Sequence, residues 1–204
     1  IDLSRVSDGD IFVGETFRQQ DSLKEVVIPD HFTEIASAMF DECANLTGVS
    51  FGTGLKTING PRTFYNTDLA SVNLPTGLEY IGDTAFQSCG LLTGVNFGDL
   101  TNLGYIGDSA FQSTAIETIN LPDSLTGIGN GSFQSMSNLT SVSMPPNLIS
   151  IGSSVFQGNA SLTGITINCP TGSWAGTNAF QSCPSGTYTI TGAYFQDYTG
   201  SSWS

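Results

Sequence analysis

Apolar side chains recur along this chain with a period of 22 to 25 residues. Each period contains one phenylalanine, and the eight of them stand at Phe17, Phe40, Phe64, Phe86, Phe111, Phe133, Phe156 and Phe180. After each of the first seven, a Leu or Ile follows at five or six residues, a Val or Ile three residues later, and another large apolar residue two residues beyond that. A period of roughly 20–29 residues is typical of a solenoid, in which each turn buries its apolar face by stacking on its neighbours.

The last two apolar positions of each unit predict a strand. They are two residues apart, as in residues 49–51 and 72–74, so both side chains point to the same side of an extended segment. Proline, which cannot donate to a strand ladder, follows the segment in four units, at Pro29, Pro75, Pro122 and Pro145. These segments are therefore expected to stack as a parallel sheet, with one short strand in each turn.

The remainder of each unit is short and polar around its phenylalanine. A second apolar pair, such as Leu78 with Ile81, closes the unit before it. Three residues before the phenylalanine stands a side chain that favours helix N-caps, namely Asp83, Asp108, Asn130 or Ser153. The chain is therefore predicted to be mostly β and irregular, with short helical turns.

The repeated phrase resembles a known family. The unit reads IGDTAFQSCGLLTGVNF at residues 81–97 and IGNGSFQSMSNLTSVSMP at residues 128–145. Over about residues 11 to 183 this resembles the BspA-like leucine-rich repeats, whose pattern is roughly I-x-x-x-A-F-x-x-C-x-x-L-T-x-V-x-L-P. The resemblance implies a right-handed leucine-rich-repeat superhelix. Because family members are commonly surface or secreted proteins implicated in adhesion, it also implies an extracellular or cell-surface location.

Two regions are expected along the chain. Residues 1–185 form the leucine-rich-repeat solenoid of about eight turns, the first of them partial. Residues 186–204 alternate like a strand and are rich in aromatics, which fits either a capping hairpin or the start of a further module. The chain opens without an initiating Met, so a processed product or a piece of a longer protein is expected.

Charge narrows the range of partners. Only 11% of the residues are charged, the net charge is -13, and no Lys, Arg or His occurs from Thr63 to the end. Nucleic acid is excluded as a partner because neutralising phosphates needs a basic footprint. Anionic membrane surfaces repel the chain for the same reason, and no apolar run is long enough to insert into a membrane.

Catalytic chemistry has few candidate residues. The chain has one histidine, His31, and no Ser or Cys nucleophile has a base beside it in the pattern. Asp83 and Asp108 occupy equivalent positions of neighbouring repeats, which places them on a flat stripe rather than in a cleft. Asp99 and Asp123 are read as solvated turn residues, with a Ca²⁺ site left as the alternative. No enzyme activity, cofactor or metal is therefore expected.

The cysteines are expected to be structural. Cys43, Cys89 and Cys183 each follow a repeat phenylalanine by three residues, and the chain has no CxxC pair. They are predicted to be small buried side chains. A disulfide between Cys169 and Cys183, stapling the last turns, stays open as an alternative.

The outward face of the predicted strands is the first candidate binding surface. It is centred on Asn73, Asn96 and Asn120, with Ser50 and Ser143 on either side. An amide supplies two donors and an acceptor, which suits sugar hydroxyls or a partner's backbone. The alternative is a stacked row of asparagines that serves solubility.

Tyr80 and Tyr105 form the second candidate surface. Each directly precedes the closing Ile of its repeat, and the two repeats are adjacent, so the rings should stack on one edge of the solenoid. Such a pair can serve as a platform for a sugar ring or as a hot spot for a protein. The alternative is that the rings only cover the edge of the core.

The function that fits best is a non-enzymatic extracellular binding or adhesion module. It would present an extended polar surface to a protein or glycan partner, as part of a larger surface or appendage protein. The alternative is a structural stalk or filament subunit that self-associates end to end, because a solenoid exposes open sheet edges at both ends. In that case the aromatic tail, with Tyr194, Phe195, Tyr198 and Trp203, would form the joint.

Overall fold

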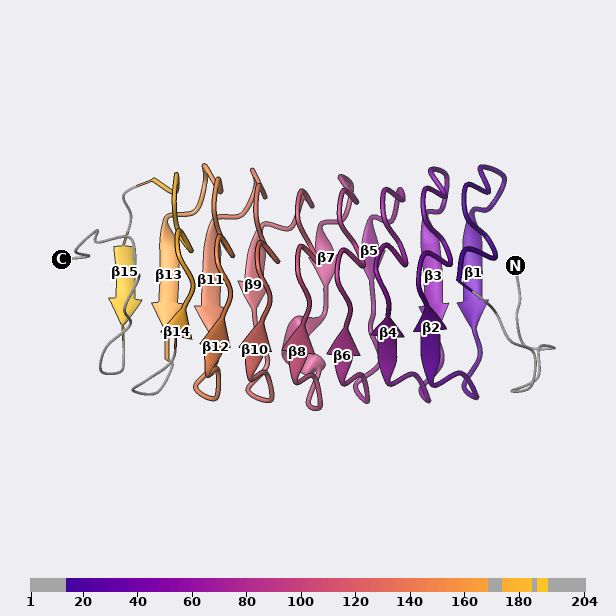
Figure 1. The fold of residues 1–204 in the computed structure, drawn as a ribbon, viewed down its shortest axis with the longest axis horizontal. Helices are drawn as coiled ribbons and strands as arrows, with labels where there is room; N and C mark the ends of the chain where they lie inside the picture. Colours follow the sequence, from indigo (N-terminus) through magenta and orange to yellow (C-terminus); the bar gives the residue numbers. More distant parts are fainter. Residues whose placement is uncertain (1–13, 169–173, 185–186, 191–204) are drawn as a thin grey trace.

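Two strands in each turn of the chain pair with the corresponding strands of the turns before and after, which makes the molecule a β-solenoid (Figure 1). The computed structural model describes residues 14–168, 174–184 and 187–190, and every strand pairing in it is parallel. The predicted parallel solenoid is therefore confirmed.

The first column of strands contains the Val and Ile positions of the repeat. Its members are β1 (Glu25–Ile28), β3 (Gly48–Phe51), β5 (Ser71–Val72), β7 (Gly94–Val95), β9 (Thr118–Asn120), β11 (Ser141–Met144), β13 (Gly164–Ile167) and β15 (Thr187–Ile190). The column is divided into the sheets β1–β3, β5–β7 and β9–β11–β13–β15. Its last strand, β15, adds a parallel rung inside the segment for which a cap or a further module is predicted; residues 191–204 lie outside the described part.

The closing apolar pair of each unit forms a second column, which the sequence analysis did not expect to be a strand. Its members are β2 (Glu34–Ala36), β4 (Thr57–Asn59), β6 (Tyr80–Ile81), β8 (Tyr105–Ile106), β10 (Gly127–Ile128), β12 (Ser150–Ile151) and β14 (Trp174–Ala175). Together they make one continuous seven-stranded sheet. Most of these strands are two residues long with a single inward Ile, so they offer no alternation from which a strand could be read.

The phenylalanine segments are extended turns rather than helices. In each segment the residues two before and two after the phenylalanine have positive φ, from Glu15 and Gln19 in the first to Asn178 and Ser182 in the last. This backbone lets the segment donate to the following turn, as in the bonds from Phe40 N–H to the Thr63 carbonyl (2.9 Å) and from Phe64 N–H to the Ala85 carbonyl (2.8 Å). Within the described residues the sole helical element is the 3₁₀ turn η1 (Phe97–Asp99).

The predicted N-caps are therefore wrong for the residues that precede the phenylalanines. Their side chains accept from the backbone of the next turn instead. Asp83 Oδ1 accepts from Asp108 N–H at 2.8 Å, Asp108 Oδ1 from Asn130 N–H at 2.7 Å, and Asn130 Oδ1 from Ser153 N–H at 2.8 Å. No helix begins there because the positive φ of the next residue takes the backbone out of the helical region.

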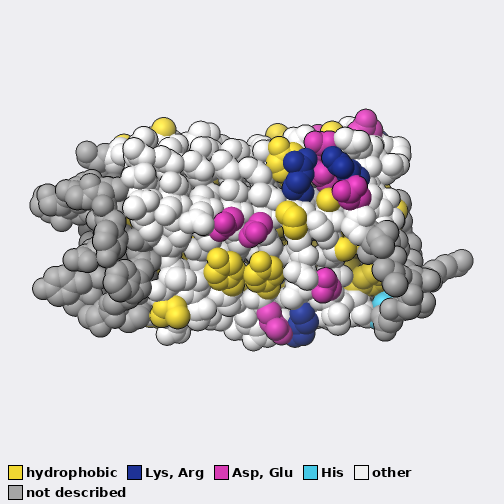
Figure 2. Space-filling model, in the orientation of Figure 1, with side chains coloured by type: hydrophobic (Ala, Val, Ile, Leu, Met, Phe, Trp, Pro, Cys, Tyr) yellow, Lys and Arg dark blue, Asp and Glu magenta, His cyan; other side chains and the backbone are white. Residues whose placement is uncertain are grey.

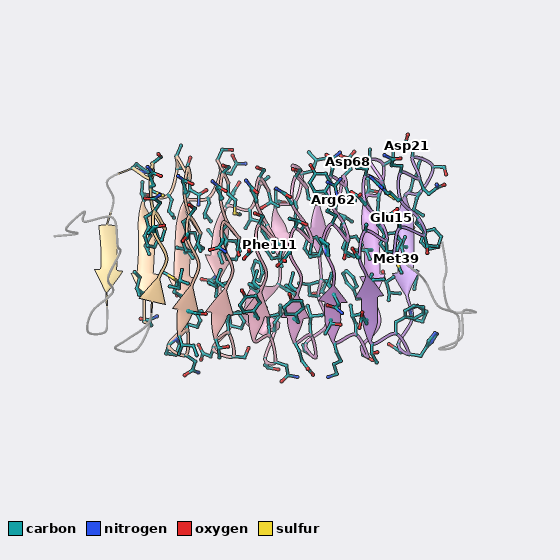
Figure 3. All side chains as sticks on the ribbon, viewed as in Figure 1. Glu15, Asp21, Met39, Arg62, Asp68 and Phe111 are labelled. Atoms are coloured by element: carbon teal, nitrogen blue, oxygen red, sulfur yellow. The ribbon has the colours of Figure 1, made fainter. Side chains whose placement is uncertain are left out.

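The eight phenylalanine rings form one stack through the core. Neighbouring ring centroids are 5.2 to 5.7 Å apart and the rings are within 3° to 14° of parallel. Phe111, in the middle of the stack, is fully buried and lies inside the solenoid (Figure 3). Since each ring is covered by the rings of adjacent turns, burial is complete only when turns stack.

Candidate functional site

Tyr80 and Tyr105 stack on the outer surface of the second column. They face each other in register on β6 and β8, with ring centroids 5.9 Å apart and planes 8° from parallel. Tyr105 is 37% exposed, and Tyr80 is half-buried. The stacking expected from their shared position in the repeat is present.

The fold does not need aromatic side chains at this position. The equivalent outward residues of neighbouring strands are Thr57, Gly127 and Ser150. Gly127 is covered by the neighbouring ring, since a Cβ built there would lie 2.7 Å from Cδ2 of Tyr105. The pair is thus flanked by small side chains on the neighbouring strands, whereas the two end strands of the column carry Glu34 and Trp174 at this position.

Two carboxylates lie close to the tyrosine pair. Burial, followed by the charges of Asp83 and Asp108, raises the pKa of the Tyr80 phenol, and the same causes together with Tyr80 raise the pKa of Tyr105. Neither carboxylate has a Lys or Arg within ion-pair distance in the described part of the chain. Figure 2 shows a face on which two acidic side chains lie beside two hydrophobic ones near the middle of the solenoid.

Three basic residues of the described N-terminal turns, Arg18, Lys56 and Arg62, form ion pairs. Asp41, whose side chain is 2% exposed, accepts from Arg62 Nη2 at 3.0 Å and from Arg18 Nε at 3.1 Å. Arg62 also reaches Glu42 at 3.1 Å, and its guanidinium carbon lies 3.9 Å from the centre of the Tyr65 ring. This cluster is visible in Figure 2 as interleaved basic and acidic side chains at one end of the molecule. No sequence motif indicated this cluster, because the ion pairs of Arg62 join residues 20 and 21 positions apart in sequence.

Asn96 does not point outward as the sequence analysis expected. Its Oδ1 accepts from Leu74 N–H at 2.8 Å and its Nδ2 donates to the Leu74 carbonyl at 2.9 Å. The backbone leaves the strand at this residue, where φ is -82° and ψ is 48°, and η1 follows. The side chain therefore replaces a backbone pair between two turns, and its amide is not available to a partner.

The rest of the predicted amide face is interrupted at the same place. Ser50, Asn73 and Asn120 are exposed, and Ser143 is half-buried next to Asn120 on β11. Ser50 lies on β3, and Asn120 and Ser143 lie on the paired strands β9 and β11, whereas Asn73 and Asn96 follow the ends of β5 and β7. The five residues consequently do not form one continuous row.

A glutamine ladder runs along the turns that follow the phenylalanines. The side-chain amides of Gln87, Gln112, Gln134 and Gln157 each donate to the next in the row, which ends at Gln181, with N–O distances of 2.6, 3.2 and 2.9 Å for the first three bonds. The sequence signal was the Gln that follows each of the last five repeat phenylalanines. The row is polar and saturated within itself, which makes it a structural feature.

The cysteine thiols are hydrogen-bond donors of the core. Cys43, Cys89 and Cys183 donate to the carbonyls of Phe17, Phe64 and Phe156 in the preceding turn, at 2.9, 3.0 and 3.0 Å. Asn159 holds the same position in its turn and donates to the Phe133 carbonyl at 2.9 Å. Burial is the main cause that raises the pKa of all three thiols. Cys183 is a free cysteine, and Cys169, its partner in the disulfide left open as an alternative, lies outside the described residues.

Little in the described residues points to catalysis or metal binding. No three His, Cys, Asp or Glu groups come together in residues 14–168 and 174–184 in a way that would hold a metal ion. His31 is half-buried against Phe32, with ring centroids 4.9 Å apart. Asp99 on η1 and Asp123 are both exposed.

The aromatic tail, to which end-to-end association was attributed, lies outside the described residues. The part of the chain that the structure describes has no helix long and apolar enough to cross a membrane.

Comparison with known proteins agrees with the repeat architecture. The sequence matches the model of the BspA type Leucine rich repeat region in six copies, over residues 11–99 and 59–187. None of the curated proteins compared with it matches.

Three solved structures share the fold at low sequence identity. A leucine rich repeat protein of T. pallidum (TpLRR) is 24% identical, with a TM-score of 0.57 over 84% of this chain and 68% of its own. The pneumococcal vaccine antigen PcpA is 20% identical, with a TM-score of 0.56 over 81% of this chain and 50% of its own. A leucine rich cell surface protein of Faecalibacterium prausnitzii is 21% identical, with a TM-score of 0.52 over 88% of this chain and 64% of its own.

Proposed function

The chain belongs to the BspA-type leucine-rich repeat family, and from this premise we propose that it is a non-enzymatic binding module. It acts at the cell surface and docks a protein or glycan partner on the edge that carries Tyr80 and Tyr105. A rigid stack of turns suits this role because it holds surface residues of successive turns at a fixed spacing.

The surface location is supported by two of the structural neighbours. PcpA is described as a vaccine antigen and the Faecalibacterium prausnitzii protein as a cell surface protein. This chain spans 50% and 64% of the length of those two proteins, so the activity of each whole protein is that of a longer chain. The large excess of acidic residues also suits a protein that stays free of anionic surfaces.

The stacked tyrosine pair is the observation that carries the binding role. The two rings stand partly exposed at positions that neighbouring turns fill with Thr57, Gly127 and Ser150. An aromatic pair that the fold does not require, placed at the surface, is typical of a hot spot at which a partner is bound. The strand face of Asn73 and Asn120 is the weaker candidate, because the row is broken at Asn96.

The test compares two double variants in a glycan array and a panel of surface and matrix proteins. Tyr80→Thr with Tyr105→Thr copies the Thr57 of a neighbouring turn and should lower binding by about tenfold or more. Asn73→Thr with Asn120→Thr changes the strand face and should leave binding within about twofold. Loss of binding by the asparagine variant alone would move the site to the strand face. Unchanged binding by both variants would exclude both surfaces.

A further inference from the structure

The carboxylates beside the tyrosine pair have no counter-charge in their half of the molecule. From Thr63 to the end the chain has eight acidic residues and no basic one. Arg18 and Arg62 contact carboxylates within the N-terminal turns, and Lys56 contacts Glu79, which directly precedes Tyr80. Asp83 and Asp108 make no such ion pair within the described residues. Each follows its tyrosine by three residues, and Asp83 Oδ1 accepts from Asp108 N–H, so the two carboxylates lie in adjacent turns as the two rings do.

The hydrogen bonds of these carboxylates do not neutralise them. Asp83 and Asp108 each accept from one backbone N–H of the next turn, and Asp108 also accepts from the Asn130 amide at 3.1 Å. All of these donors are uncharged. They fix the carboxylates in place next to the rings and leave their full negative charge to attract a cation.

An arginine of the same chain shows how a cation contacts an aromatic ring and a carboxylate together. In the turns just before the tyrosine pair the Arg62 guanidinium lies over the Tyr65 ring at 3.9 Å while it donates to Asp41 in the preceding turn. A guanidinium is suited to both contacts because it is planar, always charged and able to stack on an aromatic face. Tyr80 and Tyr105, with Asp83 and Asp108, offer equivalent groups with no arginine of their own.

We propose that the surface formed by Tyr80, Tyr105, Asp83 and Asp108 binds an arginine- or lysine-bearing segment of a protein partner. This inference rests on the proposed function and specifies the chemistry of its partner. Charge complementarity selects this occupant, since nucleic acid and anionic lipid are repelled by the same carboxylates. A neutral sugar is less suited, because it gains no charge attraction from the two carboxylates.

The test uses a synthetic peptide as the probe. An acetylated peptide of alternating Gly and Arg is titrated into the whole chain by calorimetry, and the same peptide with citrulline in place of arginine is the control. Citrulline keeps the shape and loses the charge. The arginine peptide should bind at least about tenfold tighter than the citrulline peptide, and its affinity should fall when NaCl is raised from about 50 mM to about 500 mM.

Three double variants separate a specific site from general attraction. Asp83→Asn with Asp108→Asn keeps an oxygen that accepts from the backbone N–H of the next turn, as Asn130 does at the equivalent position, and should weaken arginine-peptide binding by about fivefold. Tyr80→Thr with Tyr105→Thr should weaken it by a similar factor. Asp68→Asn with Glu117→Gln removes the same charge from exposed positions elsewhere and should change it less than about twofold.

The remaining outcomes show whether the cationic partner or the proposed function is wrong. Equal losses from the site variants and the Asp68 and Glu117 control would mean attraction to an acidic surface only, and would overturn the inference. Equal affinity for the citrulline and arginine peptides would also overturn the inference. If a partner found on the array requires the tyrosines but binds independently of salt, the proposed function stands and the cationic partner is wrong.

Discussion

In four turns the residue three positions after the phenylalanine donates to the phenylalanine carbonyl of the preceding turn. That carbonyl lies inside the core, where it must find a donor. Cys43, Cys89 and Cys183 supply a thiol, and Asn159 supplies an amide that is fully buried. This bond gives the three cysteines a structural role, although the position does not always carry a donor, since Met136 occupies it in another turn.

Truncation of Asn159 tests this account at the level of a residue. Asn159→Ala removes its bond to the Phe133 carbonyl and its bond from Met136 N–H, at 2.9 and 2.7 Å, and leaves both partners buried. We expect a loss of about 2–4 kcal/mol in the free energy of unfolding, measured with urea. Asn159→Cys restores the donor as in other turns and should lose about half as much. Equal losses for the two variants would contradict the role of the donor.

Thiol reactivity tests the burial of the same position. Burial raises the pKa of the Cys43 and Cys89 thiols, so less of the reactive thiolate is present at neutral and mildly alkaline pH. With iodoacetamide at about pH 8, both should be alkylated far more slowly in the native protein than in guanidinium, as followed by peptide mass spectrometry. Fast alkylation of Cys89 in the native protein would show that the turn opens readily.

At the scale of the element, each turn adopts a locally strained backbone and gains hydrogen bonds to its neighbours. The phenylalanine segment carries two positive-φ residues in every turn, most of them not glycine, and each costs about 1 kcal/mol or more. In return the segment donates backbone hydrogen bonds to the following turn, and the glutamine side chains of the last five segments form a parallel row. An isolated turn has neither the backbone bonds nor the glutamine row. The strands, the phenylalanine stack and the glutamine ladder therefore form together.

The glutamine ladder predicts a graded effect of truncation. Gln134 accepts from Gln112 and donates to Gln157, whereas Gln87 stands at the start of the row and makes one such bond. Gln134→Ala should therefore lower the free energy of unfolding by about 1–2 kcal/mol, roughly twice the effect of Gln87→Ala. Urea denaturation of the two variants measures the ratio. A larger loss for Gln87→Ala would mean that the amide row does not stabilise the solenoid.

On the scale of the whole molecule, the charges divide the solenoid into two parts. All five basic residues precede Thr63 in the sequence, while the chain from Thr63 onward carries only acidic ones. The tyrosine edge lies in the second part, which is why its charge is complementary to a basic partner. The stack itself is held by uncharged contacts, so the surface charge can vary without disturbing the core.

The shifted pKa values predict how stability depends on pH. The folded state raises the pKa of Cys43, Cys89, Cys183, Tyr80 and Tyr105, so it favours their protonated forms. That contribution is complete below the unfolded pKa values and is lost as pH rises through the folded ones, so stability should fall from about pH 8.5 upward.

At acidic pH the dependence of stability on pH has the opposite sign. Hydrogen bonds from Thr53 lower the pKa of Asp30, and a bond from Gln19 is the main cause that lowers the pKa of Glu42. Their contribution is present above the unfolded values and is lost as pH falls below about 4. Thermal unfolding followed by circular dichroism should give the highest midpoint between about pH 5 and 8. A midpoint that keeps rising above pH 9 would contradict this assignment.

Much of the architecture could be predicted because it depends on spacing alone. The recurring phenylalanine set the period, and the paired Val and Ile positions set the first column of strands. The same spacing brought Tyr80 and Tyr105 together, since residues at equivalent positions of adjacent turns stack wherever the turns do. The helical turns were wrong because the positive φ values fall on residues such as Ala38 and Thr84, which give no sign of it in a sequence.

The sequence by itself thus determined the solenoid, its core residues and the adjacency of its turns, because a periodic pattern of apolar side chains has one efficient way of being buried. The tertiary structure alone decided the partners of the polar atoms. Asn96 binds the backbone of Leu74 and Cys43 binds the carbonyl of Phe17, 22 and 26 residues away. A polar side chain shows in sequence what it can donate or accept, whereas the backbone group that faces it depends on where each turn bends. An insertion such as residues 98–102, which forms part of η1, moves that bend and turns an outward amide into a bond between turns.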